Sequence, residues 1–200
     1  SPRYRRALWI ALFVNAAMFW VEISAGLQAA SVSLLADAID FLGDAANYGL
    51  ALMVLGMAPV WGSRVALFKA LSMMAFGVFV LARTAWSQQH GITPEPLTMG
   101  AVGALALLAN LGVAWLLYAF REGNANMRSV WLCTRNDAIG NLAVLAAAAG
   151  VFGTSSGWPD WMVAAVMASL ALTSGWRVMQ MARGELRDPA ASTQTHSHTQ

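Results

Sequence analysis

The sequence is short of charge, of cysteine and of long polar stretches. Only 11% of its 200 residues are charged, whereas 58% are hydrophobic. A soluble domain of this size needs a charged exterior around its core, and so few charged residues cannot supply one. Cys133 is the single cysteine, which excludes a framework of intrachain disulfides. The scarcity of charge therefore indicates a protein that lies within the lipid bilayer.

Basic residues are also scarce, and they do not form a stripe along the chain. With a net charge of only +2, this pattern argues against a nucleic-acid partner. The first hydrophobic run is longer than the apolar region of a signal peptide, and no convincing cleavage site follows it. We therefore interpret that run as a membrane-spanning helix.

Long hydrophobic runs are what the sequence has in abundance. A helix needs roughly 20 mostly apolar residues to cross the hydrocarbon core of a bilayer. Six segments meet this requirement, at about 7–29, 32–56, 64–86, 97–120, 127–151 and 159–182. The sequence thus predicts an all-α polytopic membrane protein with six transmembrane helices. We expect a transport domain over residues 1–182 and a disordered polar cytoplasmic tail over 183–200.

The positions of the basic residues predict how these segments are oriented. If the chain crosses the membrane six times, ten basic residues fall on one side, with Arg64 and Lys69 at the second loop. The others on that side are Arg3, Arg5, Arg6, Arg121, Arg128, Arg177, Arg183 and Arg187. Such residues favour the cytoplasmic side. We therefore expect both termini to be cytoplasmic and the protein to lie in the bacterial inner membrane.

Three carboxylates interrupt the second hydrophobic segment, in the stretch SLLADAIDFLGDAANYGLAL at residues 33–52. Asp37, Asp40, Asp44 and Asn47 follow the spacing i, i+3, i+7, i+10, which places them on one face of a helix. A charged side chain in the bilayer centre is costly and usually lines a cavity or an ion path. The alternative is a set of interhelical hydrogen bonds that only fix packing. The spacing favours a functional stripe.

The fifth segment carries a matching stripe. Cys133, Asp137 and Asn141 are spaced i, i+4, i+8 and again share a face. If the second and fifth helices are neighbours, Asp40 and Asp44 meet Cys133 and Asp137 at a common depth. Three oxygen ligands and one sulfur form a tetrahedral site for a divalent metal ion. These four residues are the predicted metal ligands, although a free cysteine is often only a small core residue.

The ligand types narrow the choice of ion. Mg²⁺ and Ca²⁺ prefer shells of oxygen alone, so a thiolate favours Zn²⁺ or Cd²⁺, with Co²⁺, Ni²⁺, Mn²⁺ and Fe²⁺ still open. Four ionised ligands would carry a charge of −4 against the +2 of the metal. They could not all stay ionised when the metal leaves, so metal binding must expel protons. Exchange of protons for metal is one half of an antiporter, and alternating access is the other.

Several polar residues beside the predicted ligands have supporting roles. We expect Asp37 to lie next to the ligands or on the exit path rather than to bind the metal directly. Asn47 and Asn141 are predicted to hold ligands in place or to line that path. Asn15 and Glu22 share a face of the first helix, where either structural hydrogen bonds or proton transfer would suit them.

The stretch SVSLLADAIDFLGD resembles the second-helix signature of the cation diffusion facilitators, which are proton-coupled exporters of Zn²⁺ and similar ions. That family carries a His/Asp-x-x-x-Asp pair on its second helix, matched by Asp40 and Asp44. A second such pair on its fifth helix is matched by Cys133 and Asp137. The first helix also fits, with Asn15, Glu22 and Gly26. The resemblance covers residues 7–182 and implies export of metal from the cytoplasm, driven by inward proton flow.

The sequence departs from the family in two respects. Cys133 stands where His or Asp is usual, which favours softer ions. The cytoplasmic C-terminal metal-binding domain of the family has no counterpart in these residues, and we expect a variant without it. Members of this family are usually homodimers, so the resemblance implies a homodimer. We expect a transporter rather than an enzyme, without a resident cofactor, because the metal ion is cargo.

Three other functions are alternatives to this interpretation. A membrane metal sensor or chaperone would bind the ion without moving it. An intramembrane enzyme could use paired aspartates as acid and base, and a passive channel would conduct ions without regard to a proton gradient. We rank all three below an antiporter.

Overall fold

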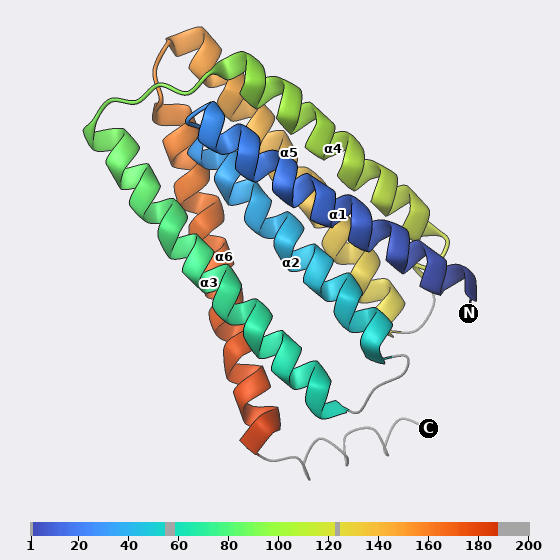
Figure 1. Ribbon diagram of the computed structural model, residues 1–200. Coiled ribbons are helices and arrows are strands. Elements are labelled where there is room, and N and C mark those ends of the chain that lie inside the picture. Colours follow the sequence, from blue (N-terminus) through green and yellow to red (C-terminus); the bar gives the residue numbers. More distant parts are fainter. Residues whose placement is uncertain (1, 55–58, 123–124, 188–200) are drawn as a thin grey trace.

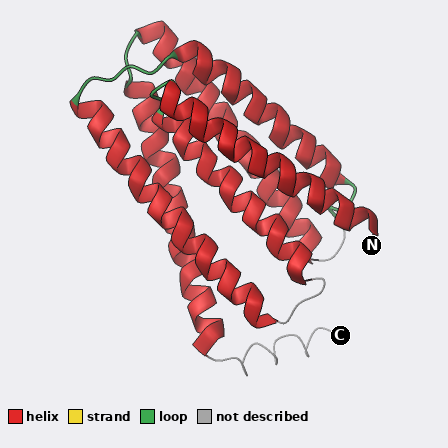
Figure 2. Cartoon of the chain, viewed as in Figure 1, coloured by secondary structure: helices red, strands yellow, loops and turns green. Residues whose placement is uncertain are grey.

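Six long helices make up most of the described chain. The computed structural model describes residues 2–54, 59–122 and 125–187, and the side chains of residues 54, 59–60 and 125–136 lie outside this description. The helices are α1 (Pro2–Gln28), α2 (Val32–Val54), α3 (Pro59–Gln89), α4 (Pro96–Tyr118), α5 (Ala125–Thr154) and α6 (Trp158–Arg187). Each of the six hydrophobic segments predicted from the sequence forms one of them. The described ranges contain no strand, so the prediction of an all-α protein is confirmed for them (Figure 2).

Three helix ends differ from the prediction by five residues, and the first is the start of α1, which lies at Pro2 rather than at residue 7. α3 begins at Pro59, earlier than the predicted start at residue 64, because proline is favoured in the first turn of a helix. The charge pattern placed Lys69 at the second loop, but Lys69 lies inside α3, ten residues after the first residue of that helix. α6 continues to Arg187, beyond the predicted end at residue 182, and a basic residue suits the last turn of a helix. Residues 188–200 of the predicted tail lie outside the described chain.

The helices pack in an up-and-down arrangement that leaves two groups side by side (Figure 1). α1, α2, α4 and α5 form one group, and α3 packs against α6 along its length. α2 lies between the groups, since it contacts α1 and α5 on one side and α3 and α6 on the other. The start of α1 and the end of α6 lie at the same end of the bundle, which we call the terminal end.

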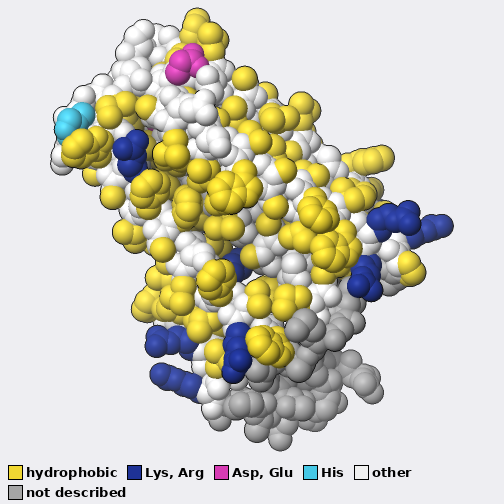
Figure 3. All heavy atoms as spheres, in the orientation of Figure 1, with side chains coloured by type: hydrophobic (Ala, Val, Ile, Leu, Met, Phe, Trp, Pro, Cys, Tyr) yellow, Lys and Arg dark blue, Asp and Glu magenta, His cyan; other side chains and the backbone are white. Residues whose placement is uncertain are grey.

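Apolar side chains cover the outside of the bundle as well as filling its centre. Trp115 and Phe68 are 81% and 74% exposed, whereas many core positions are occupied by alanine, such as Ala106 and Ala164. On the face shown in Figure 3, hydrophobic side chains spread across the middle and most basic side chains gather near the terminal end. This distribution is opposite to that of a soluble protein and suits a bilayer.

Five of the described helical segments are long and apolar enough to cross a membrane. They are Pro2–Gln28, Trp61–Gln89, Pro96–Tyr118, Asp137–Thr154 and Trp158–Arg187. α2 is not among them, because every 18-residue stretch of it contains Asp37, Asp40 and Asp44. α2 is nevertheless largely enclosed, and residues 31–39 are all buried. Neighbouring helices thus shield the acidic part of α2 from lipid.

Small residues allow the helices to approach closely at two contacts. A Cβ atom added to Gly26 of α1 would lie 2.9 Å from Leu35 Cδ2 of α2. A Cβ atom at Gly175 of α6 would lie 2.7 Å from Met74 Cγ and 3.2 Å from the Ala70 carbonyl oxygen of α3. Small residues at such contacts let backbones pack tightly where no hydrophobic effect drives association.

Acidic side chains cap two helices at the end opposite the termini. Asp160 of α6 is fully buried and accepts hydrogen bonds from Ser31 Oγ at 2.8 Å, Val32 N at 2.9 Å and Ser33 N at 3.0 Å. It therefore satisfies the first amides of α2 from another helix. Glu95 caps α4, and hydrogen bonds from the Thr98 side chain and backbone, then from Leu97, lower the pKa of its carboxyl.

Candidate metal centre

The acidic face of α2 meets α5 at a glycine. A Cβ atom added to Gly140 would lie 3.7 Å from Asp40 Oδ2 and 3.9 Å from Asp37 Oδ1. Both carboxylates therefore point at the backbone of α5, and the missing side chain leaves room for them. The neighbourhood of the second and fifth helices, on which the predicted site depends, is present in the structure.

Asp44 faces the acid of the fifth helix. Its carboxylate is 7% exposed and lies within hydrogen-bonding reach of the Asp137 carboxyl. The Tyr48 hydroxyl, one turn further along α2, donates to Asp44 Oδ2 at 3.4 Å. Two carboxylates can make such a contact only when one of them carries a proton, since both are otherwise acceptors. A cation can bridge the same pair in place of the proton.

Asp37 is held by a row of amides that reaches it from α4 through α5. Asn141 Nδ2 donates to Asp37 Oδ2 at 2.7 Å, and Asn110 Nδ2 of α4 donates to Asn141 Oδ1 at 2.6 Å. All three side chains are buried. The row leaves Asp37 Oδ1 without a donor among the described residues. The sequence placed Asp37 and Asn141 beside the ligands, but nothing in it indicated Asn110, which is an isolated amide in an apolar helix.

Glu22 of α1 adds a fifth acid to this region. It is fully buried, and neither of its oxygens has a donor among the described residues. Its carboxyl lies within hydrogen-bonding reach of Asp37. This contact, like that of Asp44 and Asp137, requires a shared proton. A structural hydrogen bond and proton transfer, the two roles that the sequence left open for Glu22, both suit this position.

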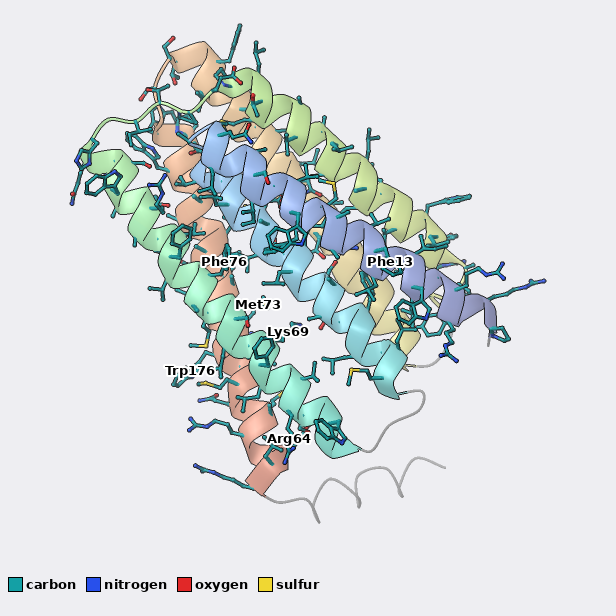
Figure 4. The ribbon with its side chains drawn as sticks, in the orientation of Figure 1. Phe13, Arg64, Lys69, Met73, Phe76 and Trp176 are labelled. Carbon is teal, nitrogen blue, oxygen red and sulfur yellow. The ribbon has the colours of Figure 1, made fainter. Side chains whose placement is uncertain are left out.

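Lys69 of α3 brings a positive charge to the acidic face, and the sequence analysis did not foresee it. Its ammonium donates a hydrogen bond to Asn47 Oδ1, and its charge acts on the Asp44 carboxylate. Lys69 Cε lies 3.9 Å from the position of a Cβ atom at Gly43, so the stem crosses α2 at that glycine. Figure 4 labels Lys69 and Met73 on the part of α3 nearest α2. Asn47 therefore pairs with a lysine.

The four predicted ligands are only partly brought together by the described side chains. Asp40 and Asp44 of α2 face Gly140 and Asp137 of α5, as described above. Cys133 lies outside the described side chains, so its place in the ligand set remains a prediction. Among the described side chains, no three acids, histidines or cysteines surround one point as metal ligands. The complete ligand set therefore stays a prediction.

Comparison with known proteins gives consistent matches. Residues 8–186 match the cation efflux transmembrane domain. The zinc transporter ZitB of Pectobacterium atrosepticum is 30% identical over 197 residues, which cover 92% of this chain and 62% of that protein. The metal cation efflux system protein CzcD of Cupriavidus metallidurans is 24% identical over 187 residues, covering 88% of the chain and 59% of that protein.

A third relative carries the coupling ions in its name. The cadmium, cobalt and zinc/H(+)-K(+) antiporter of Bacillus subtilis is 22% identical over 190 residues, which cover 87% of the chain and 60% of that protein. The chain thus spans about three fifths of the length of these relatives.

Proposed function

This chain belongs to the cation efflux family, and from that premise we propose that it exports a divalent transition-metal ion in exchange for protons. The ion sits between α2 and α5, held by Asp40, Asp44, Cys133 and Asp137. The observation that carries this proposal is that the acids of α2 face α5, with Asp40 Oδ2 3.7 Å from the Cβ position of Gly140 and Asp44 beside Asp137. Carboxylates from two helices that share one point inside a membrane form a cation site whose occupancy depends on both helices.

The donor set favours ions softer than Mg²⁺. A thiolate from Cys133 beside three carboxylates suits Zn²⁺ or Cd²⁺, since both accept mixed oxygen and sulfur shells. The names of the relatives agree with this class, because they include zinc, cadmium and cobalt. The metal ion is cargo in this proposal, and the chain needs no cofactor.

Proton exchange follows from the same carboxylates. Without metal, the contacts of Asp44 with Asp137 and of Glu22 with Asp37 each require a proton. A divalent ion that enters between Asp40, Asp44 and Asp137 supplies the positive charge that such a proton supplied before. Metal and protons therefore compete for one site, and a transporter that opens it alternately to each side couples their flows.

The whole molecule is then a six-span protein with its terminal end in the cytoplasm. Five helices qualify as spans on their own, and α2 crosses with them because its neighbours enclose its acids. The basic residues near the terminal end support this orientation in an inner membrane. Homodimer formation, as in the family, is part of the same proposal. Asp37 and Asn141 flank the site towards the outer end, and Asn47 flanks it towards the cytoplasm.

Metal uptake by proteoliposomes tests the proposal. Purified protein is reconstituted with a metal-sensitive dye inside, and Zn²⁺ or Cd²⁺ is added outside with and without an acidic lumen. An antiporter gives uptake that the acidic lumen accelerates. A sensor or chaperone gives no flux, and a channel gives flux that ignores the pH difference. Asp44→Asn should lower the rate more than about tenfold, whereas the exposed loop acid Glu122 provides the matched control, Glu122→Gln.

A further inference from the structure

Lys69 lies in a part of α3 where a charged side chain is energetically unfavourable. It is ten residues into α3, in a membrane-spanning segment, and it is half-buried. It is also the sole lysine of the chain, whose other basic side chains are all arginines. An ammonium at this depth persists only when it is paired, and such residues usually serve a function.

The groups around Lys69 belong to the candidate metal centre. From α2, Asn47 accepts a hydrogen bond from the ammonium, and Asp44 is close enough to feel its charge. The stem passes over Gly43 beside Met73. Among the described side chains, Lys69 therefore brings a positive charge to the acidic face of α2.

We propose that Lys69 is the internal counter-ion of the metal-free site, and that it must leave Asp44 when a divalent cation binds. This inference rests on the proposed function, since it assigns a competitor to the ion at that site. A lysine suits this task because its ammonium is a compact charge on a flexible four-carbon stem. From α3 the stem can swing towards the terminal end and place the charge near the interface.

The competition has a consequence for the transport cycle. A divalent ion held by several carboxylates in a poorly solvated place binds tightly and leaves slowly. An ammonium that competes for one of these carboxylates weakens metal binding and favours release. Lys69 is thus a positioning residue that sets the affinity of the site rather than a ligand. Removal of its charge should strengthen binding and slow turnover, which distinguishes this role from simple packing of α3 on α2.

Metal affinity, measured by calorimetry in detergent at one pH, tests the inference with three variants. Lys69→Gln keeps a donor for Asn47 without the charge and should bind Zn²⁺ or Cd²⁺ at least about tenfold more tightly. Lys69→Arg keeps the charge and should stay within about threefold of the parent chain. Arg64→Gln removes a charge from the same helix at an exposed position and should also change affinity by less than about threefold.

The outcomes separate the two proposals. If the parent chain binds and transports metal but Lys69→Gln binds it with unchanged or lower affinity, the counter-ion role is wrong and the proposed function stands. A fall in the melting temperature of Lys69→Gln with unchanged affinity would likewise reduce Lys69 to a packing role. If neither the parent chain nor any variant binds metal, the proposed function fails and this inference fails with it.

Discussion

A single amide, Asn141, connects three helices at the residue scale. It donates to Asp37 of α2 and accepts from Asn110 of α4, so each of its polar atoms serves a buried partner. The loss of a hydrogen-bond partner costs a buried polar group more free energy than a typical hydrogen bond contributes to stability. The position of Asp37 near the predicted ligands therefore depends on a neutral amide from a neighbouring helix.

Replacement of this amide should destabilise the protein. Asn141→Ala removes the acceptor of Asn110 Nδ2 and the donor to Asp37 Oδ2, and we expect the free energy of unfolding to fall by about 1–3 kcal/mol. Thermal unfolding in detergent measures the change. Leu142→Ala is the matched control, because Leu142 is the next residue on α5 and is 53% exposed. Equal stability of the two variants would mean that the row of amides contributes little.

The thiol of Cys133 should decide which ion the site prefers. Cys133→His replaces the sulfur by a nitrogen ligand and should shift the ratio of transport rates from Cd²⁺ towards Zn²⁺, because softer ions gain most from thiolate. Cys133→Ser should lower transport of both ions, and that of Cd²⁺ more. Competition between the two metals in the proteoliposome assay gives the ratio directly. An unchanged ratio in both variants would make Cys133 a packing residue.

At the scale of elements, α2 is anchored at its N-terminal end by α6. Asp160 accepts three hydrogen bonds from the first turn of α2 through Ser31, Val32 and Ser33. Asp160→Ala should therefore lower the free energy of unfolding by about 3 kcal/mol, since it leaves two buried amides and a hydroxyl without an acceptor. Asp160→Asn keeps one acceptor oxygen and should cost less. Similar melting temperatures for Asp160→Ala and the parent chain would show that water replaces the cap.

The contact of α3 with α6 depends on the absence of a side chain at one glycine. Gly175→Ala places a Cβ atom 2.7 Å from Met74 Cγ and 3.2 Å from a carbonyl oxygen of α3, so it should lower stability despite the higher helix propensity of alanine. Gly184→Ala, on the same helix, meets nothing within 4 Å. It should raise stability by up to about 1 kcal/mol. Melting temperatures that move in the same direction would contradict this interpretation of the contact.

At the scale of the whole molecule, the features that follow from regular spacing of residues could be predicted from the sequence. Six apolar runs gave six helices, and the spacing of Asp37, Asp40 and Asp44 placed them on one face, directed at α5 and its Asp137. Helix ends were missed by a few residues, because polar and apolar residues alike continue a helix once it has begun. The membrane orientation and the complete ligand set remain predictions.

The features that sequence reasoning missed are single residues whose partners are distant in the chain. Asp160 is 129 residues from Ser31, and Asn110 is 31 residues from Asn141. Neither Asp160 nor Asn110 belongs to a periodic pattern of polar residues that would indicate its role. Lys69 was misplaced for another reason, since a lysine near a predicted loop counts towards the positive-inside signal. Only the packing of α3 on α2 reveals that its charge faces the acids.

The central claim is that α2 and α5 hold one cation jointly, and X-ray absorption of the cadmium-loaded protein tests it most directly. The account predicts sulfur in the cadmium shell of the parent chain, from Cys133 on α5, together with oxygen ligands. It predicts that the sulfur signal is lost in Asp44→Asn, on α2, and is kept in Glu122→Gln. An all-oxygen shell in the parent chain, or a sulfur signal that survives Asp44→Asn, would contradict a shared site.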